Sequence, residues 1–304
     1  MAKEVLEIES KYDNETWKKD MRVKLDVNNM FADKIGEKQG IKKETIDGYQ
    51  DKITELHKQI KDAEKSGKMG FMELPFQEQK IIDDIKETAQ EMKGKIDNFV
   101  VLGIGGSALG SIALKTALKD PYHELSETKP KLFVPDNVDP VRFKSLLDSL
   151  DLEKTVFNVI SKSGGTAETM SEFLIAREAV VNTLGEDKLS DHFIATTSED
   201  SGNLIQIAEK ENFKTFNIPE NVGGRFSVLS PVGLLFAAVA GIDIEGLLAG
   251  ARYMYNICDT DQIWDNPAYM NGLLQYLAYE DGKVMSVMMP YSHQLKDVAD
   301  WYRQ

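Results

Sequence analysis

Five short runs that read as strands, rich in apolar residues and alternating with segments that read as helices, constrain the fold more than any other feature of this sequence. The runs are NFVVLGI, KLFVPDN, TVFNVIS, HFIATTS and FKTFNIP, between residues 98 and 219. Strands that are apolar throughout and alternate with helices are typical of a parallel sheet buried on both faces. The sequence therefore predicts an α/β fold with a doubly wound parallel sheet and right-handed crossovers.

Helical patterns flank this α/β region on both sides. Apolar residues recur at spacings of three and four before it, at Ile46, Tyr49, Ile53, Leu56 and Ile60. This spacing predicts a helical layer in the N-terminal part of the chain. After Pro231 we expect buried helices, then a strand over KVMSVMMPYS and the start of a helix at HQLKDVADWYRQ. The expected division is a helical segment over 1–75, an α/β domain over 76–245, and the incomplete start of a second α/β domain over 246–304.

The charge balance excludes two classes of partner. The 304 residues include 36 basic and 50 acidic side chains, for a net charge of −14. Such an acidic surface repels nucleic acids and anionic membranes, which bind basic patches. An anionic ligand must therefore be held by a local cluster of donors. No apolar run reaches the roughly 18 residues of a membrane span, so we expect no membrane partner.

The cysteine and histidine content favours a cytoplasmic protein without a metal. Cys258 is the single cysteine, which excludes an internal disulfide, and we expect it to be a small core residue. The charged start of the chain shows no secretory signal. His57, His123 and His192 are expected to be exposed or at helix edges, and His293 to have a local structural role. No Cys/His cluster indicates a metal site.

The segment GIGGSALG, residues 103–110, follows the first apolar run. Its glycines would let the backbone approach a ligand, with the Ser107 hydroxyl as a donor, but a tight turn with Ser107 as helix N-cap is an equal alternative. Gly103-x-Gly105-x-x-Ala108 also fits a relaxed dinucleotide fingerprint. That fingerprint requires an acidic residue about 20 positions later. The next run reaches Asp136 only 33 residues after Gly103, which disfavours a dinucleotide site.

The segment SKSGGTAET, residues 161–169, is a stronger signal. Ser161, Lys162, Ser163 and Thr166 offer three hydroxyl donors and a cation, and the glycine pair permits a nest of backbone N–H groups. One tetrahedral phosphate dianion accepts many such hydrogen bonds. We therefore predict an anion site here, and interpret Glu168 as a carboxylate that caps the following helix.

Arg225 follows the glycine pair in NVGGRFS, outside any helical stripe. An arginine in this position either forms a surface or interdomain salt bridge or stabilises an oxyanion, as enolisation chemistry requires. The local pattern leaves both readings open.

Three motifs in order, LGIGGSALG, ISKSGGTAET and NVGGRFSVLSPVGL, resemble those of the bacterial glucose-6-phosphate isomerase family. The resemblance covers about residues 95–304. It implies two sugar-isomerase (SIS) α/β domains, a homodimer, no cofactor, and the interconversion of glucose 6-phosphate and fructose 6-phosphate in glycolysis and gluconeogenesis. The substrate would then be a small-molecule sugar phosphate.

The same resemblance implies roles for individual residues. The phosphate-binding residues would be Ser161, Lys162, Ser163 and Thr166. Gly106 and Ser107 would contact the sugar, and Arg225 would stabilise the cis-enediolate. Gln304 matches a glutamine of the substrate site. Gly165 departs from the family, which commonly has threonine there, so one hydroxyl is missing from the phosphate loop.

The family's general base is a glutamate about one turn beyond the residue that matches Gln304, and its catalytic histidine and lysine come later still. None of the three is among these 304 residues. The resemblance therefore implies a C-terminally truncated chain that keeps the phosphosugar-binding residues and is catalytically incomplete. A phosphosugar-sensing SIS module and a nicotinamide dehydrogenase remain as alternatives.

Overall fold

The computed structural model describes residues 4–304, which form two compact units. The first unit contains residues 4–6 together with Gln77–Ile244 and Met289–Gln304, and the second contains Glu7–Phe76 and Glu245–Met288. Segments far apart in the sequence therefore fold together in each unit. The division into three domains that the sequence suggests stays a prediction.

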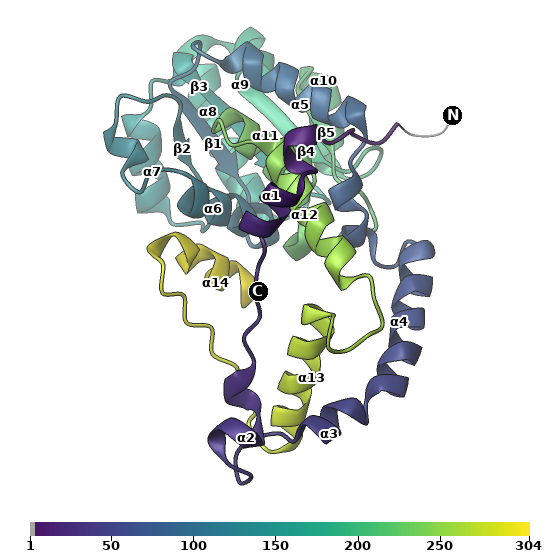
Figure 1. Ribbon diagram of the computed structural model, residues 1–304. Coiled ribbons are helices and arrows are strands. Elements are labelled where there is room, and N and C mark those ends of the chain that lie inside the picture. Colours follow the sequence, from purple (N-terminus) through teal and green to yellow (C-terminus); the bar gives the residue numbers. More distant parts are fainter. Residues whose placement is uncertain (1–3) are drawn as a thin grey trace. The chain divides into compact units, whose positions relative to one another are not determined.

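The first unit is built on a five-stranded parallel sheet (Figure 1). The strands are β1 (Asn98–Leu102), β2 (Lys131–Phe133), β3 (Thr155–Ile160), β4 (Phe193–Thr197) and β5 (Lys214–Asn217). Their order is β2-β1-β3-β4-β5, with Leu102 of β1 opposite Val159 of β3. This order reverses between β1 and β3, which is the point where ligands bind in doubly wound sheets. The predicted parallel α/β fold is confirmed.

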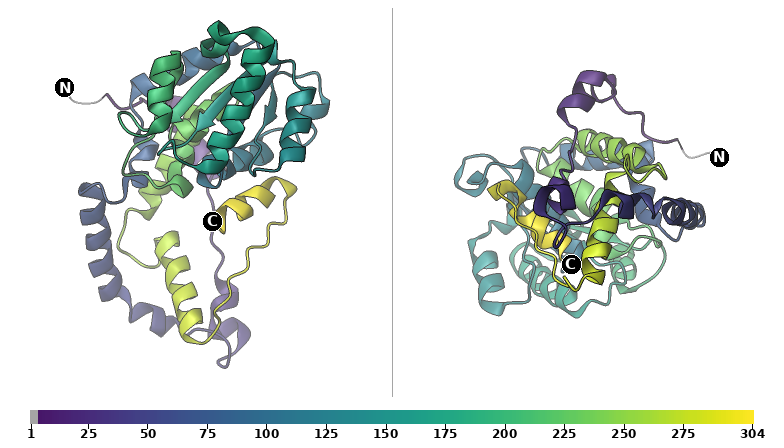
Figure 2. Two further views of the ribbon diagram at one scale, coloured as in Figure 1. Left: turned by 180° about the vertical axis from the view of Figure 1, so that it is seen from behind. Right: turned by 60° about the horizontal axis from the view of Figure 1, so that its bottom comes forward.

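Helices cover both faces of the sheet (Figure 2). In the first unit they are α5 (Gln79–Met92), α6 (Gly106–Leu118), α7 (Pro140–Ser149), α8 (Ala167–Leu184), α9 (Leu189–His192), α10 (Asn203–Glu211), α11 (Pro231–Val239) and α14 (Lys296–Tyr302). Side chains alternate along each strand, so Phe157 and Val159 point to the same face. There they form one core with Phe173 of α8 and Leu204 of α10.

Local sequence sets where several of these helices begin. Asp139 Oδ1 accepts a hydrogen bond from Arg142 N (2.7 Å) at the start of α7, and Ser230 Oγ accepts one from Val232 N (3.3 Å) at the start of α11. A proline follows each cap, in the first helical position, where its missing N–H has no consequence. These two helices are therefore fixed by short-range chemistry.

The second unit is helical over its described residues. Its helices are α1 (Glu15–Asp20), α2 (Ala32–Ile35), α3 (Lys43–Asp47), α4 (Gln50–Lys65), all of α12 (Ile244–Cys258) except its first residue, and α13 (Pro267–Glu280). Ile46 and Ile53 form a core with Met270 and Leu273 of α13. The predicted helical layer is present, but it is divided between α3 and α4 after Gly48, and Leu56 is partly exposed.

Short 3₁₀ helices connect many of these elements. They are η1 (Ser10–Tyr12), η2 (Asn28–Met30), η3 (Gly70–Met72), η4 (Leu74–Phe76), η5 (His123–Leu125), η6 (Leu152–Lys154), η7 (Glu186–Lys188), η8 (Gly224–Leu229) and η9 (His293–Leu295). The helix expected near the end of the sequence is confirmed as α14, preceded by η9.

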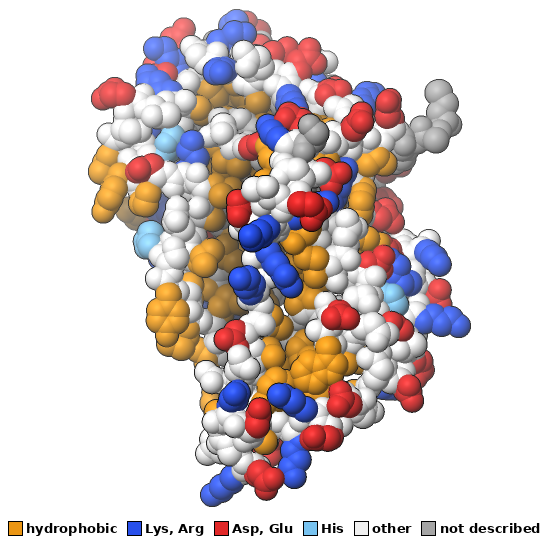
Figure 3. Space-filling model, in the orientation of Figure 1, with side chains coloured by type: hydrophobic (Ala, Val, Ile, Leu, Met, Phe, Trp, Pro, Cys, Tyr) orange, Lys and Arg blue, Asp and Glu red, His pale blue; other side chains and the backbone are white. Residues whose placement is uncertain are grey.

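The strand expected over KVMSVMMPYS is absent, and that prediction is wrong for this structure. Residues 283–290 are extended but form no strand with any described residue. Val284, Met285 and Met289 are largely exposed, and hydrophobic side chains lie on the surface over this segment (Figure 3). A strand forms only where a neighbouring strand satisfies its backbone groups. Apolar composition alone does not provide that partner.

Two histidines expected at the surface or at helix edges are buried. His123 faces the carbonyl oxygen of Pro130 (3.2 Å), and His192 Nδ1 donates a hydrogen bond to Thr155 O (2.8 Å). These backbone acceptors make burial of the imidazole rings tolerable. Cys258 is half-buried, and burial raises the pKa of its thiol. No helix in the part of the chain that the structure describes has the length and apolarity required to cross a bilayer.

Candidate active site

A cleft of about 530 Å³ lies at the carboxyl edge of the sheet, where the loops after β1, β3, β4 and β5 meet. Its lining consists mainly of hydroxyl-bearing side chains: Ile104, Ser107, Ser161, Lys162, Ser163, Thr166, Thr169, Ser198, Ser201 and Glu220. The cleft includes the β1/β3 switch point of the topology. It therefore brings together Ser107 and the four predicted phosphate-binding residues.

The β1–α6 loop depends on close backbone packing. A Cβ atom at Gly106 would overlap the carbonyl carbon of Gly224 and lie 2.5 Å from Arg225 N. No side chain larger than hydrogen fits at this position without moving the loop that carries Arg225. Gly106 thus holds the β1–α6 loop directly against the start of η8.

The β3–α8 loop arranges its hydroxyl groups as donors. Ser161 Oγ accepts a hydrogen bond from Gly164 N (3.0 Å) and donates a longer one to Thr166 Oγ1 (3.4 Å). Ser163 Oγ accepts one from Gly165 N (3.2 Å). The hydroxyl protons of Ser163 and Thr166 therefore remain available for a ligand. Such a donor set suits an anion with several oxygens.

Lys162 is only partly available to a ligand. Its ammonium group donates hydrogen bonds to the backbone carbonyls of Glu220 and Val222, the second at 3.3 Å. An ammonium group has three N–H donors, so one remains. Lys162 lines the cleft and also connects the loop after β5 to the β3–α8 loop.

Arg225 and Gln304 lie together but do not line the 530 Å³ cleft. Arg225 Nη1 donates a hydrogen bond to Gln304 O (3.2 Å), and Trp301 Nε1 donates one to Arg225 O (3.0 Å). The Gln304 side-chain nitrogen is 2.9 Å from the position that a Cβ atom would take at Gly105. The end of α14, the start of η8 and the β1–α6 loop thus form one cluster beside the cleft.

Sequence reasoning missed the apolar Ile104 and four polar residues that line the cleft: Thr169, Ser198, Ser201 and Glu220. A signal for Ser198 and Ser201 exists in the segment SEDSGN, residues 198–203. This segment directly follows the buried strand β4 and contains two serines and a glycine, much as SKSGG follows β3. Glu168, by contrast, is exposed in the first turn of α8 and does not line the cleft.

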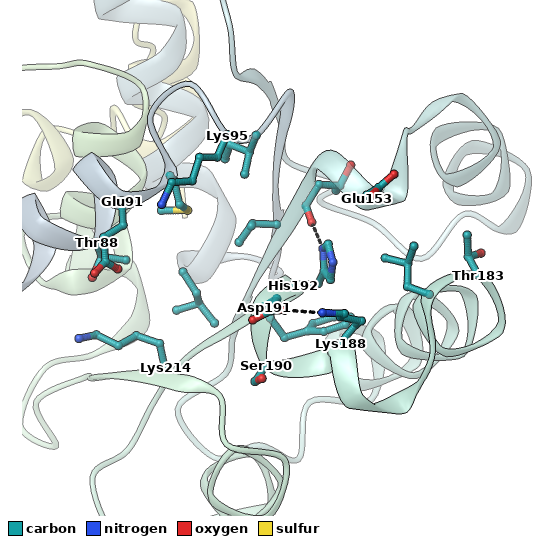
Figure 4. A pocket seen from close by; sticks show the side chains of 17 residues that line it. Thr88, Glu91, Lys95, Glu153, Thr183, Lys188, Ser190, Asp191, His192 and Lys214 are labelled. Atoms are coloured by element: carbon teal, nitrogen blue, oxygen red, sulfur yellow. Dashed lines mark hydrogen bonds and ion pairs between the residues drawn. The ribbon is translucent and has the colours of Figure 1, made fainter.

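A second cavity of about 740 Å³ lies at the opposite, amino edge of the sheet (Figure 4). His192 faces it, and Lys188 pairs with Asp191 at 3.7 Å. Its charged lining is balanced, with Lys95, Lys188 and Lys214 against Glu91, Glu153 and Asp191. Since ligands of parallel α/β sheets bind at carboxyl edges, the 530 Å³ cleft is the stronger candidate.

Comparisons with known proteins agree on one family. The family model described as phosphoglucose isomerase matches residues 77–304. The chain is 47% identical to a glucose-6-phosphate isomerase of Carboxydothermus hydrogenoformans over 93% of its length and 62% of that relative's. It is 34% identical to a probable glucose-6-phosphate isomerase of Methanococcus maripaludis, over 91% of its length and 61% of that relative's. The chain thus spans about three fifths of the length of these relatives.

Two solved structures are similar to the chain in fold and sequence. A hypothetical protein of Thermus thermophilus matches with a TM-score of 0.74 and 32% identity, over 85% of this chain and 60% of that one. A glucose-6-phosphate isomerase of Chlamydia trachomatis matches with a TM-score of 0.62 and 26% identity, over 73% of this chain and 42% of that one.

Proposed function

The chain belongs to the phosphoglucose isomerase family, and from this premise we propose that it is the substrate-binding part of a glucose-6-phosphate isomerase. The carboxyl-edge cleft binds the phosphate group shared by glucose 6-phosphate and fructose 6-phosphate. The names of the relatives from Carboxydothermus and Methanococcus support this substrate pair.

The observation that carries the proposal is the donor arrangement of the β3–α8 loop. The hydroxyl protons of Ser163 and Thr166 are free, and Lys162 retains one N–H. No described side chain caps α8, so its first-turn amide groups also face outward as donors. A helix N-terminus with hydroxyl groups beside it is a favourable site for a phosphate dianion.

The cluster formed by the β1–α6 loop, the start of η8 and the end of α14 has two proposed roles. It binds the sugar, and it stabilises the negative charge that develops on the substrate during the reaction. Gly106 and Ser107 contact the sugar at the start of α6, and Gln304 lies beside them. Arg225 stabilises the negative charge of the cis-enediolate, which exists only along the reaction path. Support comes from the contacts of Arg225 with Gln304 and of Gly106 with the start of η8.

Titration calorimetry on the 304-residue chain tests the binding proposal. Glucose 6-phosphate should bind, whereas glucose and NAD should not. Ser163→Ala and Thr166→Ala should each weaken glucose 6-phosphate binding by about 1–3 kcal/mol, the usual cost of a lost hydrogen bond to a charged group, because these are the two hydroxyl groups of the loop with free protons. Ser171→Ala is the matched control, because this hydroxyl bonds Ala167 O (2.7 Å) within α8 and lies outside the cleft. Unchanged affinity in both cleft variants would refute the proposal.

We also propose that the protein acts as a homodimer in the cytoplasm. The support is the family itself, together with a sequence in which 50 acidic side chains outnumber 36 basic ones. Sedimentation equilibrium at micromolar concentration measures the first part, and a mass equal to one chain would contradict it. Cell fractionation measures the second.

A further inference from the structure

The connection between β4 and α10 faces the same cleft as the phosphate loop. Ser198 and Ser201 from this connection line the cleft together with Ser161, Ser163 and Thr166. The loop after β4 thus forms a further side of the cleft, in addition to the loops that follow β1 and β3.

The β4–α10 connection is in backbone contact with the phosphate loop. A Cβ atom at Gly164 would lie 2.9 Å from Asn203 N and still closer to Leu204 N. One at Gly202 would lie 2.9 Å from the carbonyl carbon of Ser163. Both glycines have positive φ, +61° and +99° respectively. The two loops therefore form one continuous surface, and Ser201 lies one residue from the contact with Ser163.

The hydroxyl groups of this side of the cleft differ in their availability. Ser198 Oγ is committed, since it donates a hydrogen bond to Lys162 O (2.7 Å). Ser201 Oγ is exposed in the cleft and bonds no residue between 4 and 304. Its proton is therefore available to a ligand. No side chain of the described residues caps α10, so the amide groups of its first turn also lack a side-chain acceptor.

A second observation indicates that the cleft accommodates a polar ligand. Thr169 Oγ1 lines the cleft, its side chain is 1% exposed, and it has no hydrogen-bond partner among residues 4–304. Buried hydroxyl groups are nearly always hydrogen-bonded. An oxygen of a bound ligand would satisfy Thr169 from within the cleft.

We propose that the β4–α10 connection is part of the phosphate site, and that Ser201 Oγ donates a hydrogen bond to a phosphate oxygen opposite Ser163 and Thr166. The inference rests on the proposed function, because it extends the same phosphate site. Gly165 offers no side-chain donor to the cleft, and a Cβ atom there would meet only Ser163 Oγ, at 3.7 Å.

Titration of the full 304-residue chain at about pH 8, where the phosphate is a dianion, tests the role of Ser201. Inorganic phosphate and glucose 6-phosphate are the two probes. Ser201→Ala should raise the Kd for both by about tenfold, as expected for one hydrogen bond to a charged group. Ser201→Thr keeps the hydroxyl and should remain near wild type. Ser190→Ala removes an equally exposed hydroxyl at the opposite edge of the sheet and should change nothing.

The outcomes separate this inference from the proposed function. If Ser163→Ala weakens binding but Ser201→Ala does not, the role of Ser201 is overturned and the proposed function is unaffected. Ser201→Ala could weaken binding of inorganic phosphate while glucose 6-phosphate does not bind even the wild type. That result would support the role of Ser201 in the phosphate site and refute the proposed substrate. Absence of binding by both probes, or equal losses in Ser201→Ala and Ser201→Thr, would overturn the inference.

Discussion

Glu172 is a buried carboxyl group with an unsatisfied oxygen. Its side chain is 4% exposed on the face of α8 that packs toward the sheet, and Oε1 has no hydrogen-bond partner within the described residues. Burial raises the pKa of this carboxyl to about 7. The Arg142 guanidinium opposes the shift and the Asp136 carboxylate adds to it, both with smaller effects. The neutral form of Glu172 is therefore favoured in the folded state.

This pKa shift predicts that stability falls as pH rises. The folded carboxyl binds its proton more tightly than the unfolded one, so the free energy of unfolding decreases between about pH 4.5 and 7. The decrease from this group is about 3 kcal/mol when complete. Glu172→Gln should remove this part of the pH dependence, as measured by urea denaturation at a series of pH values. Glu178→Gln, an exposed change on the same helix, is the control. Parallel pH profiles for wild type and Glu172→Gln would contradict the assignment.

At the scale of elements, the site depends on loops that meet backbone to backbone. Gly106 at the start of α6 contacts Gly224 and Arg225 at the start of η8. The end of α14 is fixed to the same place, because Trp301 donates a hydrogen bond to Arg225 O. The other end of α14 is held by the hydrogen bond from Thr116 of α6 to Asp297. The position of Arg225 therefore depends on three elements that are distant in the sequence.

Gly106→Ala should disrupt this arrangement. The added methyl group overlaps backbone atoms that have no flexible side chain to displace, so the free energy of unfolding should fall by about 1–3 kcal/mol. Binding of glucose 6-phosphate should weaken as well. Gly250→Ala in α12 is the control, since nothing lies within 4 Å of its added Cβ atom, and it should be neutral or stabilising by about 0.5–1 kcal/mol. Denaturant melts of both variants measure the difference. Equal effects would refute the close-packing explanation.

At the scale of the whole molecule, we expect the chain to bind sugar phosphate without catalysing its isomerisation. Moving a proton between adjacent sugar carbons requires a positioned base within about 3 Å, and such groups typically contribute 10²–10⁴-fold. Glu220 is the only carboxylate among the described residues that line the cleft. It is exposed, and its backbone carbonyl is held by Lys162. None of the described residues that line the cleft is therefore assigned as the general base.

We expect the 304-residue chain to bind fructose 6-phosphate without isomerising it. A chimera that continues with the C-terminal part of the Carboxydothermus hydrogenoformans relative should regain activity, because the chain spans only 62% of that relative. A coupled assay that consumes the glucose 6-phosphate formed measures both proteins. Equal turnover by the two would contradict the prediction. In that event, Glu220→Gln would show whether the cleft carboxylate is the base.

Local sequence indicated the sheet and the hydroxyl-rich β3–α8 loop. Continuous apolar runs specify β1, β3 and β4, because strands buried on both faces have no polar face to show in the sequence. The edge strands β2 and β5 are only partly buried, and their runs include polar residues. The hydroxyl residues and glycines that follow β3 were likewise visible as a local cluster, and they do meet in one cleft with Ser107. The order β2-β1-β3-β4-β5 is one of the few that a doubly wound sheet allows, but no local pattern selects it.

Only the tertiary structure decided which distant segments complete the site and the units. The β4–α10 connection, which carries Ser201, touches the β3–α8 loop because Gly164 and Gly202 allow close backbone contact, and no spacing in the sequence encodes that contact. Residues 283–290 have the apolar composition of a strand but remain extended and exposed, since no described strand offers them hydrogen bonds. His192 is buried because Thr155 provides a carbonyl acceptor from another element. Sequence periodicity indicates which residues of one segment are buried. The loop contact, the absence of a strand and the burial of His192 depend instead on residues from other segments, which come close only when the chain folds.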